Sequence, residues 1–280
     1  MLILLTKQYS DEEDFGSKHI NYTSKGNSNS FENIYQKINL ESFTKEIIKG
    51  FPSIYYLCNL PNNETLFMSI GFSSLSADNH LCIVSDCIKI TLIASREFST
   101  ILAAEYYEGN IFLIEKKEIF DPDFDKSIWF TTKFYLHKMR MKTRKWSRLS
   151  EIPCKNYQYS LLGFFKKIIL VSAENCEMIE YDIFTRSFSV LPLELAIGYK
   201  LLQKNQNKLY LINLPGNIYE SQIADSYSWN IICTNSIEYY STESIVKAKN
   251  KGVLYFIKQD AVYHFNFDAT GIKKINNLKM

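Results

Sequence analysis

The sequence is poor in the two residues that β-rich proteins use most often to make turns. Among 280 residues there are 10 glycines and 6 prolines, and every glycine stands singly. A phosphate-binding glycine loop is therefore excluded, because such loops need several closely spaced glycines. Turns must instead rely on Asn, Asp and Ser, which hydrogen-bond their own backbone or tolerate left-handed geometry.

A charge excess and a long apolar run are also lacking. The chain carries 32 basic and 30 acidic residues and a net charge of +2, which gives no electrostatic argument for binding nucleic acid or an anionic membrane. No apolar stretch approaches the ~20 residues that a membrane-spanning helix needs. Residues 1–5 are apolar but too few for the core of a signal peptide. We therefore expect a cytoplasmic protein.

Motifs that carry chemistry are lacking as well. The sequence has no Gly-x-Ser-x-Gly and no Cys-x-x-Cys, and its histidines are isolated: His19, His80, His137 and His264. We interpret the six cysteines as buried free thiols of a reducing compartment: Cys58, Cys82, Cys87, Cys154, Cys176 and Cys233. We expect no enzyme activity, no catalytic residue, no metal site and no cofactor.

What the sequence does contain is aromatic residues and a repeat. Tyr and Phe occur 19 times each, which favours β-sheet. Two segments, starting at Met139 and Tyr181 and thus 42 residues apart, share Thr-Arg-x-aromatic-Ser-x-Leu. Each predicts a hairpin with its turn at Thr-Arg. Weaker copies make six hairpins in all, at residues 38–48, 81–93, 227–232 and 265–275.

A short apolar run precedes each hairpin, at residues 1–5, 66–70, 111–114, 168–171, 209–212 and 253–257. Such runs predict inner strands that are buried on both faces between neighbouring units. Most runs follow one more apolar segment, so the unit is four strands in about 41–57 residues. This repeat predicts an all-β, six-bladed β-propeller of four-stranded antiparallel blades. A short helix over residues 39–49 competes with the first hairpin.

The repeat resembles the Kelch family in three features. These are the segments Tyr181-Asp182-Ile183 and Phe265-Asn266-Phe267, the aromatic Phe188 seven residues after Tyr181, and Leu191-Pro192. The family's Gly-Gly pair is missing in every unit. We predict one domain over residues 1–280 with blades at about 1–50, 51–96, 97–153, 154–194, 195–236 and 237–280, the first without its opening strand.

The resemblance implies a function in protein binding, since Kelch proteins commonly serve as protein-binding platforms, often beside modules that recruit a ubiquitin ligase. We expect a monomeric, non-enzymatic scaffold that binds a protein partner through loops on one face, with a ubiquitin-ligase substrate adaptor as its specific form. The alternative is an enzyme or lectin-like module that acts on carbohydrate in the central channel.

The expected contact loops are the long connections at residues 9–31 and 116–133, and the candidate partner-binding residues are Asp121, Asp123, Phe124 and Asp125. The aspartates have the opening spacing of a calcium loop, but Lys126 and Thr132 replace its Gly and Glu, so we favour a solvated loop. A basic cluster predicts the solvated face of an outer hairpin. It comprises Lys133, His137, Lys138, Arg140, Lys142, Arg144, Lys145 and Arg148.

Overall fold

The computed structural model is built of β-strands and short turns. It describes residues 2–7, 34–39, 44–48, 54–70, 79–84, 90–92, 100–120, 130–153, 159–172, 177–193, 200–205, 208–212, 217–223, 227–234, 245–248, 253–258, 261–266 and 272–277. In these ranges a single short 3-10 turn, Pro61–Asn63, accompanies the strands. None of the described segments is a helix long and apolar enough to cross a bilayer.

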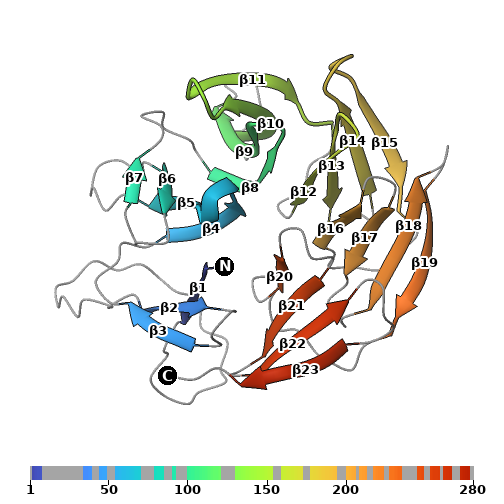
Figure 1. Cartoon of the computed structure of the whole chain (residues 1–280). Coiled ribbons are helices and arrows are strands. Elements are labelled where there is room, and N and C mark those ends of the chain that lie inside the picture. The colour runs from blue at the N-terminus through green and yellow to red at the C-terminus, as the bar shows by residue number, and fades with distance from the viewer. Residues whose placement is uncertain are drawn as a thin grey trace, which may run out of the picture.

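The described strands form six antiparallel sheets that succeed one another in chain order around a ring (Figure 1). The first sheet has three strands: β1 (Leu2–Lys7), β2 (Ile34–Asn39) and β3 (Thr44–Ile48). The second has four: β4 (Ile54–Asn59), β5 (Thr65–Ile70), β6 (Asn79–Val84) and β7 (Ile90–Leu92). Because β2 and β3 pair as a hairpin, the helix considered over residues 39–49 is wrong.

The remaining four sheets each have four strands. They contain β8 (Thr100–Tyr107), β9 (Asn110–Phe120), β10 (Phe130–Arg140) and β11 (Lys145–Glu151), then β12 (Tyr159–Phe164), β13 (Lys167–Ser172), β14 (Glu177–Asp182) and β15 (Phe188–Pro192). There follow β16 (Lys200–Asn205), β17 (Lys208–Ile212), β18 (Ile218–Ile223) and β19 (Tyr227–Cys233), and last β20 (Ile245–Ala248), β21 (Val253–Lys258), β22 (Ala261–Asn266) and β23 (Ile272–Asn277). Within each sheet, every strand pairs with its neighbour in sequence.

The second strands of the central sheets are buried on both faces, as the apolar runs predict. Ile111 and Leu113 of β9 pack against sheet β4–β7, whereas Phe112 and Ile114 pack against sheet β12–β15. This division follows from the strand period, since successive side chains point to opposite faces. All four residues are at most 1% exposed. The core of the molecule therefore lies between the sheets.

The innermost position in the ring belongs to the first strand of each sheet rather than to the second. Strand β8 contacts β4 and β12, and β12 contacts β16, across the sheet boundaries. Figure 1 shows these four strands nearest the centre. The expectation that the apolar runs form the inner strands is therefore wrong in position. Strand β8, at this innermost position, is only partly buried.

The connection expected over residues 116–133 is shorter than predicted. Strands β9 and β10 continue their pairing to Phe120 opposite Phe130. The extra pairs contain Ile119, Thr131 and Thr132, whose side chains favour strands. The charged residues Lys116 and Glu118 lie within β9, where they form an ion pair at 2.9 Å, and do not end the strand.

The two-faced burial makes a stability prediction. Leu211 of β17 is fully buried between sheets β12–β15 and β16–β19. We expect Leu211→Ala to lower the free energy of unfolding by about 2–5 kcal/mol, because it removes buried apolar surface and leaves a cavity. Val190 is 48% exposed, so Val190→Ala should cost less than about 1 kcal/mol. Equal urea midpoints for the two variants would contradict the packing described above.

Candidate functional site

The two Thr-Arg repeats form the same hairpin turn in adjacent sheets. Residues 141–144 join β10 to β11, and residues 183–187 join β14 to β15. In each turn the arginine N–H donates to the carbonyl four residues earlier: Arg144 to Arg140 at 2.8 Å and Arg186 to Asp182 at 2.9 Å. Both arginines have a positive φ, +52° and +58°. These two predicted hairpins are thus confirmed, and the sequence repeat is a repeat of backbone geometry.

A second turn lies at the same end of each of these sheets. Residues Glu108–Gly109 join β8 to β9, and residues Phe165–Lys166 join β12 to β13. All four residues have positive φ, between 44° and 75°. Two-residue turns of this kind match the twist of a hairpin and normally contain Asn and Gly. Phe165 is therefore an unusual residue at its position.

One backbone hydrogen bond ties the two turns of each sheet together. The Met141 N–H donates to the Gly109 carbonyl at 3.1 Å, and the Ile183 N–H donates to the Lys166 carbonyl at 3.0 Å. The two sheets therefore have equivalent corners built from different side chains. Lys142 in one corner corresponds to Phe184 in the other.

A close contact joins the two corners across the sheet boundary. The ring of Tyr107, at the end of β8, packs on Gly163 of β12, where an added Cβ would lie 2.0 Å from the Tyr107 Cγ. The Tyr107 hydroxyl accepts a hydrogen bond from the Lys166 N–H at 3.1 Å. Burial raises the pKa of the Tyr107 phenol. The contact needs a residue without a side chain at position 163.

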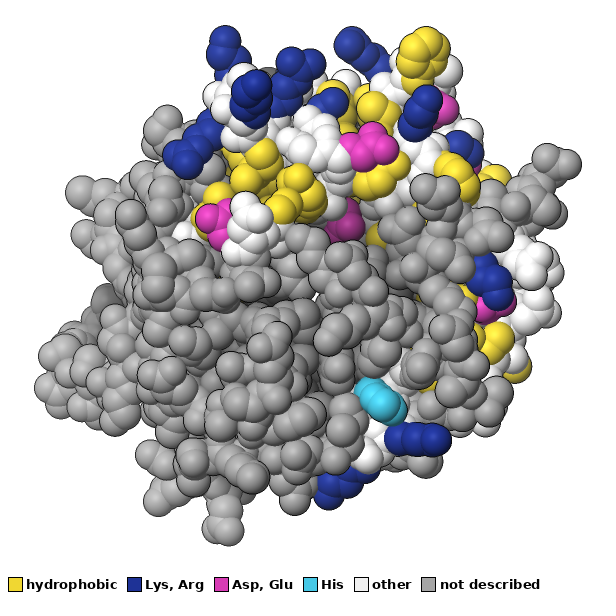
Figure 2. Space-filling model, viewed as in Figure 1, with side chains coloured by type: hydrophobic (Ala, Val, Ile, Leu, Met, Phe, Trp, Pro, Cys, Tyr) yellow, Lys and Arg dark blue, Asp and Glu magenta, His cyan; other side chains and the backbone are white. Residues whose placement is uncertain are grey.

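Seven exposed side chains of these corners form what we call the turn surface: Lys142, Arg144, Lys145, Phe165, Lys166, Phe184 and Arg186. Phe184 is 90% exposed and Phe165 is 53% exposed. The five cations form no ion pair with any carboxylate in the described part of the chain. Figure 2 shows Lys and Arg side chains gathered with hydrophobic ones over sheets β8–β11 and β12–β15.

Asp182 sets the shape of the corner that presents Phe184. Its Oδ1 accepts hydrogen bonds from the Phe184 and Thr185 N–H groups, each at 2.8 Å. The bond from the Thr185 backbone is the largest of the causes that hold the pKa of Asp182 below its usual value. Because hydrogen bonds from backbone N–H groups to the Asp182 carboxylate fix this turn, the exposed Phe184 ring is not needed to form it.

Two carboxylates, the buried Glu180 and the partly buried Glu220, are engaged in structural contacts. Glu180 on β14 accepts hydrogen bonds from Lys167 at 2.8 Å and from the Tyr227 hydroxyl on β19 of the next sheet. Burial, followed by the neighbouring Glu180 carboxylate, raises the pKa of the Tyr227 phenol well above its ordinary value. Glu220 is held in the same way by Lys208 at 2.6 Å and by the Tyr210 hydroxyl. The bond between Glu180 and Tyr227 joins sheet β12–β15 to sheet β16–β19.

The basic cluster of residues 133–148 was predicted to lie on the solvated face of an outer hairpin. This is wrong for His137 and correct for the residues named next. Arg140, Arg148 and the cations of the 141–144 turn are exposed, as expected for an outer hairpin. His137 is fully buried, and its Nε2 lies 2.8 Å from Oε2 of Glu115. The register places His137 opposite Leu113, which packs against sheet β4–β7. Alternation along the strand therefore directs this histidine into the core.

Burial suppresses the chemistry of two of the three described cysteines. Cys58 and Cys82 are buried free thiols, as predicted, whereas Cys233 is a free thiol that is only partly buried, against the prediction. Burial raises the pKa of Cys58, and it raises the pKa of Cys82 to about 11. Both are therefore protonated at neutral pH and are poor nucleophiles. Across the residues that the structure describes, no three His, Cys, Asp or Glu side chains are grouped as metal ligands.

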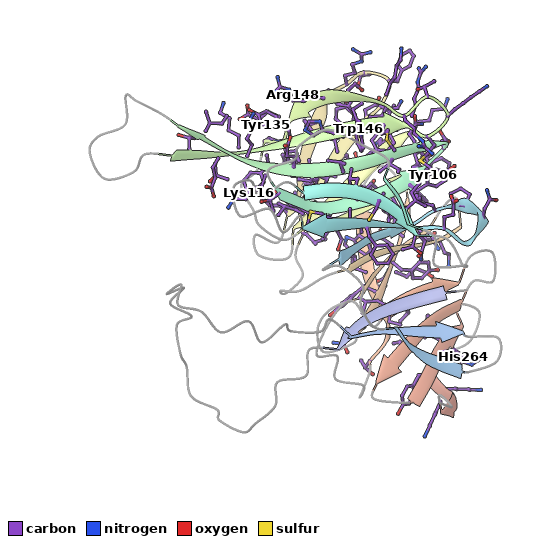
Figure 3. All side chains as sticks on the ribbon, turned by 90° about the vertical axis from the view of Figure 1, so that its left-hand side faces the viewer. Tyr106, Lys116, Tyr135, Trp146, Arg148 and His264 are labelled. Atoms are coloured by element: carbon purple, nitrogen blue, oxygen red, sulfur yellow. The ribbon has the colours of Figure 1, made fainter. Side chains whose placement is uncertain are left out.

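The predicted partner-binding residues Asp121, Asp123, Phe124 and Asp125 lie outside the described residues. The strand ends that flank them, Phe120 and Phe130, are at the end of the sheet opposite the turn surface. Figure 3 shows Lys116, on the way to that end, and Tyr106 near the turn surface. Sequence reasoning missed Phe165 and Phe184. Their signal was an aromatic residue at a position where a turn favours Asn, Asp or Gly.

The Tyr107–Gly163 contact can be tested by a double-mutant cycle. We expect Gly163→Ala to lower the free energy of unfolding by about 1–3 kcal/mol, because the new methyl group overlaps the tyrosine ring. In a Tyr107→Ala background the same change should cost clearly less, measured by urea unfolding. An equal cost in both backgrounds would show that the two residues do not meet.

The Tyr227–Glu180 bond predicts both a stability and a pH effect. We expect Tyr227→Phe to lower the free energy of unfolding by about 1–3 kcal/mol at pH 7, and the control Tyr263→Phe to change it little. Because the folded state raises the pKa of Tyr227, its contribution is complete below the unfolded pKa of about 10 and declines above it. The difference between the wild type and Tyr227→Phe should therefore shrink in alkaline solution. A difference that grows there would contradict the assignment.

No protein-family profile and no curated protein matches the sequence. The structure is similar to TolB from Acinetobacter baumannii, with a TM-score of 0.57, 11% identity, and coverage of 88% of this chain and 61% of that chain. A chain of the nidogen/laminin complex has a TM-score of 0.57 and 10% identity over 88% of this chain and 90% of that one. A functionally unknown protein from Desulfotomaculum acetoxidans DSM 771 has a TM-score of 0.55 and 11% identity, covering 87% and 75%. The chain thus spans about three fifths of TolB, and these likenesses show a β-propeller fold.

Proposed function

We propose that this chain is a cytoplasmic, monomeric, non-enzymatic protein-interaction scaffold built on a six-bladed, Kelch-like propeller. Five four-stranded sheets and one three-stranded sheet in the described residues support six blades. The equivalent corners at residues 141–144 and 183–186 support a Kelch-like repeat. The buried free thiols Cys58 and Cys82 support a reducing compartment.

The observation that carries the proposal is the contrast between the interior and the turns. Inside, Glu180 and Glu220 are used in ion pairs and tyrosine hydrogen bonds, within one sheet for Glu220 and between two sheets for Glu180. At the turns, Phe184 is 90% exposed, and the hydrogen bonds to Asp182 form its turn without any contact from the phenylalanine ring. Large exposed aromatic residues on a rigid support are typical of protein interfaces.

The similar structures support the same proposal. One of them is a chain in a complex of nidogen with laminin, and its fold resembles this chain over 88% of the residues. For the Kelch-like form of the proposal, the partner is a ubiquitin-ligase subunit or a ligase substrate. The predicted contact residues Asp121, Asp123, Phe124 and Asp125 belong to the proposal as one contact site.

The proposal is tested with the intact chain as bait in its native cells, by crosslinking and mass spectrometry. We expect a protein that is captured reproducibly and that also binds the purified chain. The heat-unfolded chain serves as the control and should not capture this protein. Replacing Asp121, Asp123, Phe124 and Asp125 with serine should weaken that binding about tenfold or more if this loop is the contact. A chain that binds no protein directly but binds or cleaves a glycan would overturn the scaffold proposal in favour of the carbohydrate alternative.

A further inference from the structure

The turn surface combines cations with exposed aromatic rings in a way that the fold does not require. We propose that it is the docking site of an acidic protein segment that carries an apolar side chain. This inference rests on the proposed function and names the partner chemistry. It concerns Lys142, Arg144, Lys145, Phe165, Lys166, Phe184 and Arg186.

The charge of the turn surface differs from that of the whole chain. Five cations are gathered there, although the chain as a whole has a net charge of only +2. The described carboxylates of the two corners are Glu108 and Asp182, and Asp182 is committed to two backbone N–H groups. The local field is therefore positive and attracts an acidic segment more strongly than the net charge indicates.

The two phenylalanines supply apolar contacts that the turns do not use. Phe165 has φ +44°, a left-handed conformation that a bulky L-residue adopts at an energetic cost and that Asn or Gly would adopt more easily. Its ring packs edge-on against Phe164, with centroids 4.7 Å apart, yet it remains 53% exposed. Phe184 sits on the adjoining turn, which the Ile183–Lys166 hydrogen bond holds in place. The pair forms two neighbouring anchors for an apolar side chain.

The surface is also preorganised. The Met141–Gly109 and Ile183–Lys166 backbone bonds fix each corner, and the Lys166–Tyr107 bond joins the two corners. A partner therefore orders side chains but little backbone when it binds, which reduces the entropic cost of association.

A protein segment fits this arrangement better than a nucleic acid does. An apolar centre with charged residues at its periphery is the usual composition of a protein interface. Nucleic-acid sites extend as basic stripes over domains of strongly positive charge. Here the charge is local, and Phe184 is the most exposed large apolar side chain in the described residues.

The test uses the full chain and short fluorescein-labelled peptides rich in Asp and Glu with one central Leu or Phe. We expect binding, followed by fluorescence anisotropy, that weakens with salt and is lost when Asn and Gln replace the acids or Ser replaces the apolar residue. Phe184→Ser and the pair Lys142→Glu/Lys145→Glu should each weaken binding about tenfold or more. Matched controls are Ile231→Ser, at an exposed apolar residue, and Lys273→Glu/Lys274→Glu, at exposed cations of another sheet. The controls should bind as the wild type does.

Unchanged urea midpoints of all variants confirm that the differences are not caused by unfolding. Equal binding by the turn-surface variants and the wild type would overturn the inference, as would tighter binding of a uridine homopolymer or of phosphatidylserine vesicles. If a partner captured by the intact chain binds the turn-surface variants normally, the docking site is wrong but the scaffold function stands. If no protein binds the chain at all, the scaffold function itself fails.

Discussion

Each pair of neighbouring central sheets packs around its own apolar layer, and the whole structure depends on these layers. Each central second strand sends alternate side chains into two layers, as Ile111 and Phe112 do on opposite faces of β9. A sheet cannot shift by one residue without exposing one of these sets and burying polar side chains in its place. The register within the sheets and the contact between the sheets are therefore parts of one constraint.

Charged groups near these apolar layers are accommodated because they meet partners there. Glu180 accepts hydrogen bonds from Lys167 of its own sheet and from Tyr227 of the next, so that one carboxylate joins two sheets. Removing a single partner would leave a desolvated charge, which is why such groups stabilise one arrangement of the sheets. Tyr107 fulfils a similar role at the previous boundary by packing on Gly163. These contacts hold the turns rigidly, and rigid turns can display exposed side chains for binding.

Local patterns in the sequence predicted the hairpins well. The Thr143-Arg144 and Thr185-Arg186 turns are where expected, because their geometry depends on hydrogen bonds within a few residues. The apolar runs also predicted the buried second strands of the sheets whose side chains the structure describes. The length of the β9–β10 hairpin was not predicted, since its charged residues resemble a loop while their pairing partners lie across the hairpin. The depth of His137 was missed for a related reason, because its face is decided by its register with Leu113.

The sequence by itself determined the all-β class, the repeated hairpins and the strands that carry the core, since these follow from side-chain period and turn chemistry. Only the tertiary structure decided that the first strands of the sheets lie innermost and that a Tyr227–Glu180 bond joins two sheets. It also decided that the exposed Phe165 and Phe184 lie at the same end of two sheets as five exposed cations. The physical reason is that these features depend on contacts between residues far apart in the chain. A local pattern describes how each segment folds, but the packing between sheets sets which segments become neighbours.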